Sequence, residues 1–195
     1  MKTCSVLLAF VALMMVALFA ASAAEAFQCK DIPAASNWNA QKYLGRWFEI
    51  AKYNFIFEDG LDCVNANYSL RADGRVGINN QGNKGSPTGP LESAIGSATI
   101  KSPGLLEVTF DSEPVKVPAP YLVIEIGDDY SYAIVYSCSN YVLFHTEIIW
   151  ILSRTPTLPE DEVSRLVYRV HNTYGFDTSK LSYTVQGPQC AYGPE

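Results

Sequence analysis

A series of short segments rich in aromatic and β-branched residues, separated by Gly, Pro, Asn and Asp, constrains the fold of this chain more than any other feature. The pattern predicts strands joined by tight turns. Eight strands with mostly short connections favour an antiparallel up-and-down meander that closes into a barrel, because closure removes exposed sheet edges. We expect the strands at Gly45–Asn54, Cys63–Arg71, Arg75–Asn80, Ser93–Lys101, Leu105–Asp111, Tyr121–Ile126, Ser131–Ser137 and Val142–Ser153.

Side-chain alternation indicates which face of two of these strands is buried. Apolar and polar residues alternate without a fault along 106–111, so Leu106, Val108 and Phe110 share one face. Along 63–70, Val64, Ala66, Tyr68 and Leu70 share one face, and Asn65, Asn67 and Ser69 share the other. We therefore expect the second set on the solvent face.

The sequon Asn67-Tyr68-Ser69 lies within that second strand. A glycan needs a solvent-facing asparagine, and the alternation gives Asn67 that orientation. We therefore predict Asn67 as a glycosylation site.

One substantial helix is predicted after the last strand. The strand at 142–153 is apolar on both faces near its end, so another element must cover its outer face. The segment 157–160 reads as a capping box in which Thr157 and Glu160 are the partners, and Gly175 can end the helix in a left-handed conformation. Five apolar residues fall on one stripe of this helix: Val163, Leu166, Val167, Val170 and Tyr174.

The amino-terminal 26 residues have the composition of a signal peptide. Lys2 precedes an unbroken apolar run from Val6 to Ala21, and Ala24-Glu25-Ala26 is an A-x-A cleavage site. The alternative reading is a membrane anchor, and no later segment is apolar for the ~18 residues that a spanning helix needs. We expect residues 1–26 to be removed, leaving one domain at 27–195, secreted and without stable membrane insertion.

Charge and cysteine content agree with export. The chain has 14 Lys and Arg against 20 Asp and Glu, a net charge of −6, which disfavours a nucleic-acid partner. Without the leader, four cysteines remain: Cys29, Cys63, Cys138 and Cys190. They form no C-x-x-C pair, so two disulfides are favoured over a metal site, although spacing leaves three pairings open.

An eight-stranded barrel is either just filled by side chains or wide enough for one small ligand. Aromatic rings with polar tips on the inner faces favour a flat or elongated apolar molecule with a few polar ends. Core packing alone is the alternative role for each of these rings. The candidate ligand contacts are Tyr68, Val108, Phe110, Tyr121, Tyr136, Phe144 and Trp150.

Three segments resemble the lipocalin family. The segment 39–50 contains Gly45-Arg46-Trp47 and is similar to the G-x-W signature that begins the first strand. The segments 132–138 and 151–159 are similar to the family's seventh strand and to the junction of its last strand with the helix. The resemblance implies an eight-stranded antiparallel calyx, mainly β, with one carboxyl-terminal α-helix packed outside.

The resemblance also implies particular contacts. It pairs Cys29 with Cys138 and Cys63 with Cys190, which ties both chain ends to the barrel. It places Arg154 over the Trp47 ring at the closed end, where Gly45, Trp47 and Arg154 are structural. It assigns Tyr68, Phe110 and Trp150 to the pocket lining.

Two branches of the family are similar to this chain. Tyr132–Cys138 resembles apolipoprotein D and its pigment-binding relatives, and the run 184–192 resembles crustacyanin, the carotenoid-binding invertebrate branch. Asp128-Asp129-Tyr130 replaces the usual Thr-Asp-Tyr, so the resemblance does not determine the conformation of that turn. The loop 111–118 mixes polar and apolar residues, which argues against lipoprotein contact. A bound carotenoid, bilin or lipid is therefore expected, with a pigment carrier and a fatty-acid or steroid carrier as alternatives.

Two further function classes are alternatives to a carrier. An enzyme is not expected, and no catalytic cofactor, because a lipocalin isomerase uses a free pocket thiol and the cysteines here are expected to be paired. An interaction protein, such as a subunit of a homo- or hetero-oligomeric pigment assembly, is the other class. Exposed rings at Tyr53, Phe55 and Phe57 near the barrel mouth could serve a dimer or a ligand gate.

Overall fold

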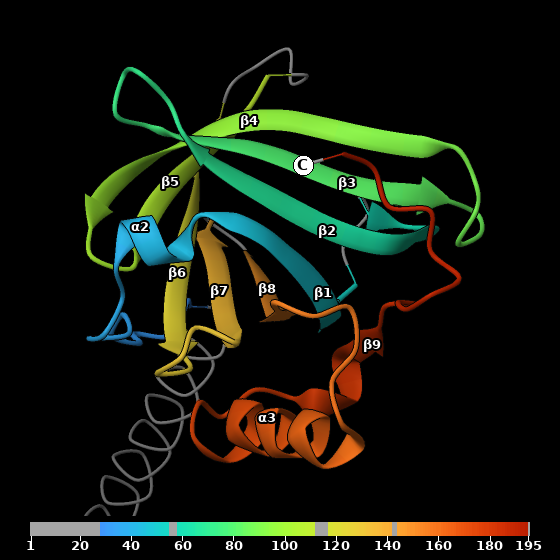
Figure 1. Cartoon of the computed structure of the whole chain (residues 1–195). Helices are drawn as coiled ribbons and strands as arrows, with labels where there is room; N and C mark the ends of the chain where they lie inside the picture. Colours follow the sequence, from blue (N-terminus) through green and yellow to red (C-terminus); the bar gives the residue numbers. More distant parts are fainter. Residues whose placement is uncertain (1–27, 55–57, 112–116, 142–143, 195) are drawn as a thin grey trace, which may run out of the picture.

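The computed structural model describes residues 28–54, 58–111, 117–141 and 144–194. Eight antiparallel strands form a closed barrel, because β1 pairs with β8 on one edge and with β2 on the other. A short ninth strand pairs with the end of β1, and one long helix packs outside the barrel (Figure 1). The elements are α2 (Ala40–Tyr43), β1 (Gly45–Tyr53), β2 (Leu61–Leu70), β3 (Val76–Lys84), β4 (Leu91–Ser102), β5 (Leu105–Phe110), β6 (Ala119–Ile126), β7 (Tyr132–Asn140), β8 (His145–Ser153), α3 (Glu160–Asn172), the 3₁₀ helix η2 (Thr178–Lys180) and β9 (Leu181–Tyr183).

The eight-stranded barrel with an outer helix is confirmed. The sequence pattern ended the third strand at Asn80, whereas β3 continues to Lys84 and pairs with both neighbours along this stretch. The added residues are polar, so they lack the aromatic and β-branched composition that marks a strand. The short strand β9 was not predicted, because three residues are too few to show a strand pattern.

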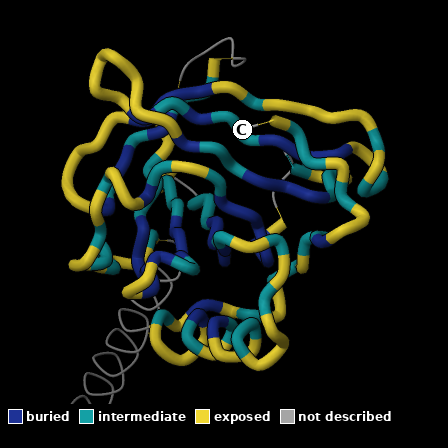
Figure 2. The backbone as a smooth tube through the Cα atoms, viewed as in Figure 1, coloured by how far each residue is buried: buried dark blue, intermediate teal, exposed yellow. Residues whose placement is uncertain are grey.

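Two layers of apolar side chains lie on opposite faces of the sheet. The inner layer fills the closed end of the barrel and includes Trp47, Val123 and Ala133, all fully buried. The outer layer lies between the sheet and α3, where Leu166 and Val170 are fully buried. Figure 2 shows the buried stretches along the strands and the exposed turns between them.

The helix α3 covers the outer face of β6, β7, β8 and the end of β1, as the two-sided apolar character of β8 indicated. All five residues of the expected stripe pack in this layer. Gly175 has φ +69°, and the amide of Phe176 donates to the carbonyl of Val170 at 3.1 Å, which confirms the left-handed end.

The predicted capping box is wrong. The helix begins at Glu160 with Pro159 as N-cap, and no side chain caps it. A cap at Thr157 would require helical backbone at Leu158, but the residue before a proline avoids that conformation. The carbonyl of Pro159 instead accepts the first helical hydrogen bond, from the amide of Val163 at 3.0 Å.

The carboxyl-terminal segment covers part of the outer face of β2 and β3. Asn65, expected on the solvent face, is only 2% exposed. The Asn83 amide donates to the carbonyl of Ala191 at 3.1 Å, and Gln81 donates to the carbonyl of Pro194 at 3.1 Å. The solvent-face expectation for Asn65 is therefore wrong, because a segment more than a hundred residues later in the chain covers this face at Gln81, the cross-strand partner of Asn65.

Both implied disulfides are confirmed. Cys29 bonds to Cys138 and Cys63 bonds to Cys190, each with a Cα–Cα distance of 5.7 Å. Their sequence separations of 109 and 127 residues fix both ends of the described chain to the barrel. No helix in the described part of the chain is long and apolar enough to span a membrane.

Candidate ligand-binding site

The closed end of the barrel is locked around Trp47. The Arg154 guanidinium lies 3.8 Å from the centre of the Trp47 ring and donates hydrogen bonds to the carbonyls of Arg46 at 2.8 Å and Lys42 at 2.7 Å. Gly45 has φ +90°, a conformation that favours glycine, and it brings the chain close to Arg154. The implied stacking of Arg154 on Trp47 is confirmed.

The turn that departs from the family pattern also packs at this end. Tyr130 has φ +61°, and its hydroxyl donates to the carbonyl of Asn37 at 2.6 Å. This contact joins the turn before β7 to the segment that leads into α2.

Three tyrosines meet inside the barrel next to the contact between Arg154 and Trp47. The hydroxyl oxygens of Tyr43 and Tyr121 are 2.8 Å apart, and those of Tyr68 and Tyr121 are 3.1 Å apart. We call Tyr43, Tyr68 and Tyr121 the tyrosine floor. With five aliphatic residues, it lines a cavity of about 20 Å³: Val76, Ile78, Ala98, Leu106 and Val108.

The inner face opens towards solvent above the tyrosine floor. Phe110, Tyr121 and Trp150 lie on the inner layer but keep intermediate exposure, unlike the fully buried residues at the closed end. The Tyr121 and Trp150 rings stack with centroids 6.4 Å apart at 29°. These three rings are therefore a partly exposed, apolar part of the inner layer.

The structure brings together five of the seven candidate ligand contacts. Tyr68, Val108, Phe110, Tyr121 and Trp150 all belong to the inner layer.

The inward placement expected of Tyr136 is wrong. Its ring lies on the outer layer, 5.2 Å from the ring of Phe176, and its hydroxyl accepts from the Lys30 amide at 3.0 Å. The inner face of β7 is formed instead by Ala133 and Val135. The alternation of residues along β7 could not distinguish its inner face from its outer face, because both faces are apolar and α3 shields the outer face from solvent.

Phe144 also lies away from the inner layer. It precedes β8, is 55% exposed and stacks on Tyr141 with centroids 4.7 Å apart. The described residues therefore place it at the end of the β7–β8 hairpin. Of the three rings proposed for the barrel mouth, Phe55 and Phe57 lie outside the described residues, and Tyr53 is buried against Phe176.

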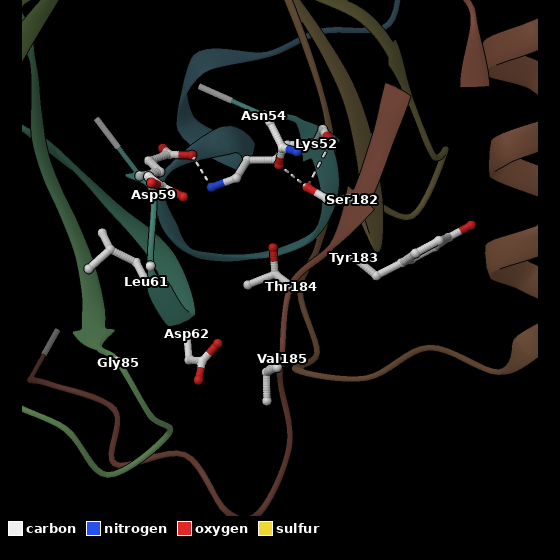
Figure 3. Close-up of a pocket in the computed structure, with 12 residues that line it drawn as sticks. Lys52, Asn54, Asp59, Leu61, Asp62, Gly85, Ser182, Tyr183, Thr184 and Val185 are labelled. Carbon is white, nitrogen blue, oxygen red and sulfur yellow. Dashed lines mark hydrogen bonds and ion pairs between the residues drawn. The ribbon is translucent and has the colours of Figure 1, made fainter. Parts of the chain in front are cut away.

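A larger and more polar cavity lies beside the barrel mouth. Its volume is about 420 Å³, and it lies between the end of β1, the start of β2 and the segment 182–185. Figure 3 shows Lys52, Asp62 and Thr184 around it. Sequence reasoning missed this region, since its residues come from distant segments and carry no shared motif.

A buried ion cluster forms one side of this cavity. The Lys52 ammonium is 2.5 Å from a Glu58 carboxylate oxygen and 3.1 Å from one of Glu49, which also accepts a hydrogen bond from the Thr184 hydroxyl. Burial raises the pKa of Glu49 to about 8, and the nearby charge of Glu58 adds to that shift. Burial lowers the pKa of Lys52, but the two carboxylates outweigh it, and the pKa is raised. No group of metal-ligating side chains is found among the described residues.

The sequon residue lies on the outer face of β2. Asn67 is half-buried, its amide donates to the side-chain oxygen of Asn65 at 3.3 Å, and its own oxygen accepts from Arg46 at 3.1 Å. Glycosylation at Asn67 stays a prediction.

Comparison with known proteins identifies the family. Residues 38–186 match the family model described as a lipocalin-like domain. The chain belongs to the lipocalin family. Its G-x-W motif and its stacked Arg154 therefore form the closed end of a lipocalin barrel.

Individual relatives support the same assignment. This lipocalin is 38% identical over 164 residues to apolipoprotein D of Mus musculus, covering 82% of each chain. It is 33% identical over 160 residues to the outer membrane lipoprotein Blc of Escherichia coli K12, covering 80% of this chain and 84% of the relative. It also matches the crystal structure of lobster apocrustacyanin A1 with a TM-score of 0.66 at 28% identity, covering 79% of this chain and 83% of the other. Lipocalins are in general binding and transport proteins rather than enzymes.

Proposed function

We propose that this lipocalin is a secreted carrier that holds a small apolar molecule inside its barrel. The observation that carries the proposal is the inner surface formed by Phe110, Tyr121 and Trp150, which stays accessible above a sealed end. Partly exposed aromatic rings that gather on one concave inner face are typical of the lining of a small-molecule site.

Desolvation supplies the binding free energy. Apolar ligand area that leaves water contributes about 25 cal/mol per Å², so burial of ~300 Å² gives roughly 7.5 kcal/mol before ordering costs. The rings that line the space are held by the barrel, and Tyr121 is fixed by two hydroxyl contacts. A preformed surface lowers the ordering cost of binding.

The ligand we propose first is a carotenoid or another pigment. The carboxyl-terminal run resembles crustacyanin, and the fold match to lobster apocrustacyanin A1 supports that choice. A fatty acid or steroid is the alternative, supported by the higher sequence identity to apolipoprotein D. Assembly into a pigment-carrying homo- or hetero-oligomer is compatible with either ligand.

Secretion after loss of residues 1–26 is part of the proposal. Two disulfides support it, since such bonds persist in oxidising compartments. We also propose a single domain at 27–195, a glycan at Asn67 and no enzymatic activity.

The first test is extraction of the native protein followed by mass and absorption spectra of the released molecule. A coloured polyene or tetrapyrrole supports the pigment carrier, whereas a colourless fatty acid or steroid supports the alternative. Protein from its source that carries no small molecule, and that binds none when titrated, contradicts the carrier.

The second test locates the site. Trp150→Ala removes an inward ring and is expected to weaken binding of the extracted ligand about tenfold or more. Tyr136→Phe is the matched control, because Tyr136 lies on the outer layer, and it is expected to leave affinity unchanged. Equal effects of the two variants would place the ligand outside the barrel.

A further inference from the structure

Two ionisable side chains of β1 face the barrel interior. Glu49 is the cross-strand partner of Leu152, and Lys52 is the cross-strand partner of Trp150. Directly paired residues of antiparallel strands share one face of the sheet, and Leu152 and Trp150 both belong to the inner layer. Glu49 and Lys52 are only 3% and 6% exposed. An ion cluster is therefore buried beside Trp150, one of the rings proposed to line the ligand space.

The ammonium of Lys52 is held by two carboxyl groups. Its nitrogen is 2.5 Å from an oxygen of Glu58 and 3.1 Å from an oxygen of Glu49. Burial raises the pKa of Glu49 to about 8, so at neutral pH this group is mainly protonated and Glu58 balances the lysine. When Glu49 ionises, the cluster carries one negative charge. In neither state does the cluster have an unbalanced positive charge.

The cavity beside this cluster has an acidic lining. Among the described residues that line its volume of about 420 Å³, Lys52 is the only cation, whereas Glu58, Asp59 and Asp62 are acidic. Figure 3 shows the Lys52 side chain extending towards the part of the chain that carries Asp59. Three acidic side chains against one lysine leave the lining with a negative charge, which repels an anion.

An ionised carboxylate at the end of a ligand that lies along Trp150 meets one of two costs. It displaces a carboxyl group from Lys52, which leaves that group buried without its partner, or it loses its water without gaining a cation. A hydroxyl or a hydrocarbon end carries no charge and meets neither cost.

We propose that Glu49 and Glu58, by holding the ammonium of Lys52, make the barrel entrance select ligands with an uncharged end over ionised carboxylates. This inference rests on the proposed carrier function and specifies the class of its cargo. Between the two alternative lipids, it favours a steroid over a fatty acid. A polyene that ends in a hydroxyl or in hydrocarbon meets the same requirement.

The first test compares two probes that share one polyene and differ at the terminal carbon, all-trans-retinol and all-trans-retinoate. Their dissociation constants are measured at neutral pH by tryptophan fluorescence quenching on the full secreted chain. We expect retinol to bind about tenfold more tightly, because the carboxylate of retinoate finds no free cation. Equal affinities, or tighter binding of retinoate, overturn the inference and leave the carrier intact. Failure of both probes to bind contradicts the carrier, and the inference fails with it.

The role of the two carboxyl groups is tested in the double variant Glu49→Gln, Glu58→Gln. Both substitutions keep the size of the side chain and remove its charge, so the charge of Lys52 becomes unbalanced. They are made together, because loss of Glu58 alone removes one cause of the raised pKa of Glu49, which then ionises and pairs with Lys52. We expect the variant to bind retinoate about tenfold more tightly than the unaltered chain does. A folded variant with unchanged affinity for retinoate overturns the inference.

Glu92→Gln is the matched control. Glu92 pairs with Lys84 at 2.8 Å, but the two side chains are 46% and 63% exposed. Solvent and salt screen an exposed lysine, so its release adds little attraction for a ligand. We expect this variant to keep the retinol preference of the unaltered chain. A gain in retinoate affinity as large as in the double variant would show that overall charge sets the preference, and it would overturn the role of Lys52.

A third probe covers the case in which the double variant does not fold. All-trans-retinylamine carries the same polyene with an ammonium in place of the carboxylate, and its affinity is measured on the unaltered chain. We expect retinylamine to bind more tightly than retinoate, because the acidic lining attracts a cation. Equal or weaker binding of retinylamine would show that desolvation of any charge sets the order of affinities, and it would overturn the inference.

Discussion

Replacement of Arg154 by alanine tests the lock at the closed end of the barrel. The guanidinium stacks on Trp47 at 3.8 Å and bridges the carbonyls of Arg46 and Lys42. The substitution removes the stacking cation and leaves two backbone acceptors without their donor. These contacts join the end of β8 to the chain around α2 and β1, so their loss weakens the closure of the barrel.

The size of the effect follows from the three contacts. Cation–π stacking contributes about 1 kcal/mol, and a charge-assisted hydrogen bond contributes up to ~3 kcal/mol when buried. Because Arg154 is half-exposed, we count about 1 kcal/mol for each hydrogen bond. The expected decrease in the free energy of unfolding is therefore about 3 kcal/mol, or roughly 9 °C in Tm for a chain of this size.

Thermal and guanidinium unfolding of the two proteins measure this difference. Arg165→Ala is the matched control, since Arg165 also lies over a ring, that of Tyr132 at 4.9 Å, but sits exposed beside Glu162. We expect the Arg165→Ala control to lower the free energy of unfolding by less than about 1 kcal/mol. A loss at Arg154 no larger than the loss at Arg165 would refute the reasoning, as would a large change in ligand affinity with stability intact.

Three further outcomes are expected. Replacing Cys29 and Cys138 by alanine opens a loop of 109 residues and should lower the free energy of unfolding by roughly 4–5 kcal/mol in denaturant titrations, and a loss below ~1 kcal/mol would contradict this. Gly45→Ala should lower it by about 1–2 kcal/mol, because φ is +90° there, and an unchanged midpoint would count against that strain. Burial raises the pKa of Glu49 from 4.5 to about 8, so the folded protein retains a proton that the unfolded chain releases, and stability should fall as pH rises between those values. Glu49→Gln should flatten this part of the stability profile, and an identical pH dependence in the variant would show that Glu49 is already ionised at neutral pH.

Local sequence was sufficient for much of the barrel. Alternation along β5 identified Leu106, Val108 and Phe110 as one inward face, because a strand directs successive side chains to opposite sides. The G-x-W segment and the junction at Arg154 lie in short motifs, and the resemblance that they carry implied their contact across more than a hundred residues.

The candidate site was predictable only where one face of a strand is apolar and the other is polar. Tyr68 and Phe110 lie on strands of that kind, and both belong to the inner layer. On β7 both faces are apolar, so the position of Tyr136 was decided by α3, which packs on the outer face. A period of two residues cannot show which of two apolar faces points into the barrel.

Sequence by itself determined the eight strands of the barrel, the outer helix and the apolar character of the barrel wall, since these follow from local periodicity. Tertiary structure decided which residues share an environment. The carboxyl-terminal segment buries Asn65, and packing of distant segments around Glu49 raises its pKa. The convergence of Tyr43, Tyr68 and Tyr121 likewise required α2, β2 and β6 to meet at one point. Hydrogen bonding and desolvation depend on neighbours in space, which the order of residues along the chain does not specify.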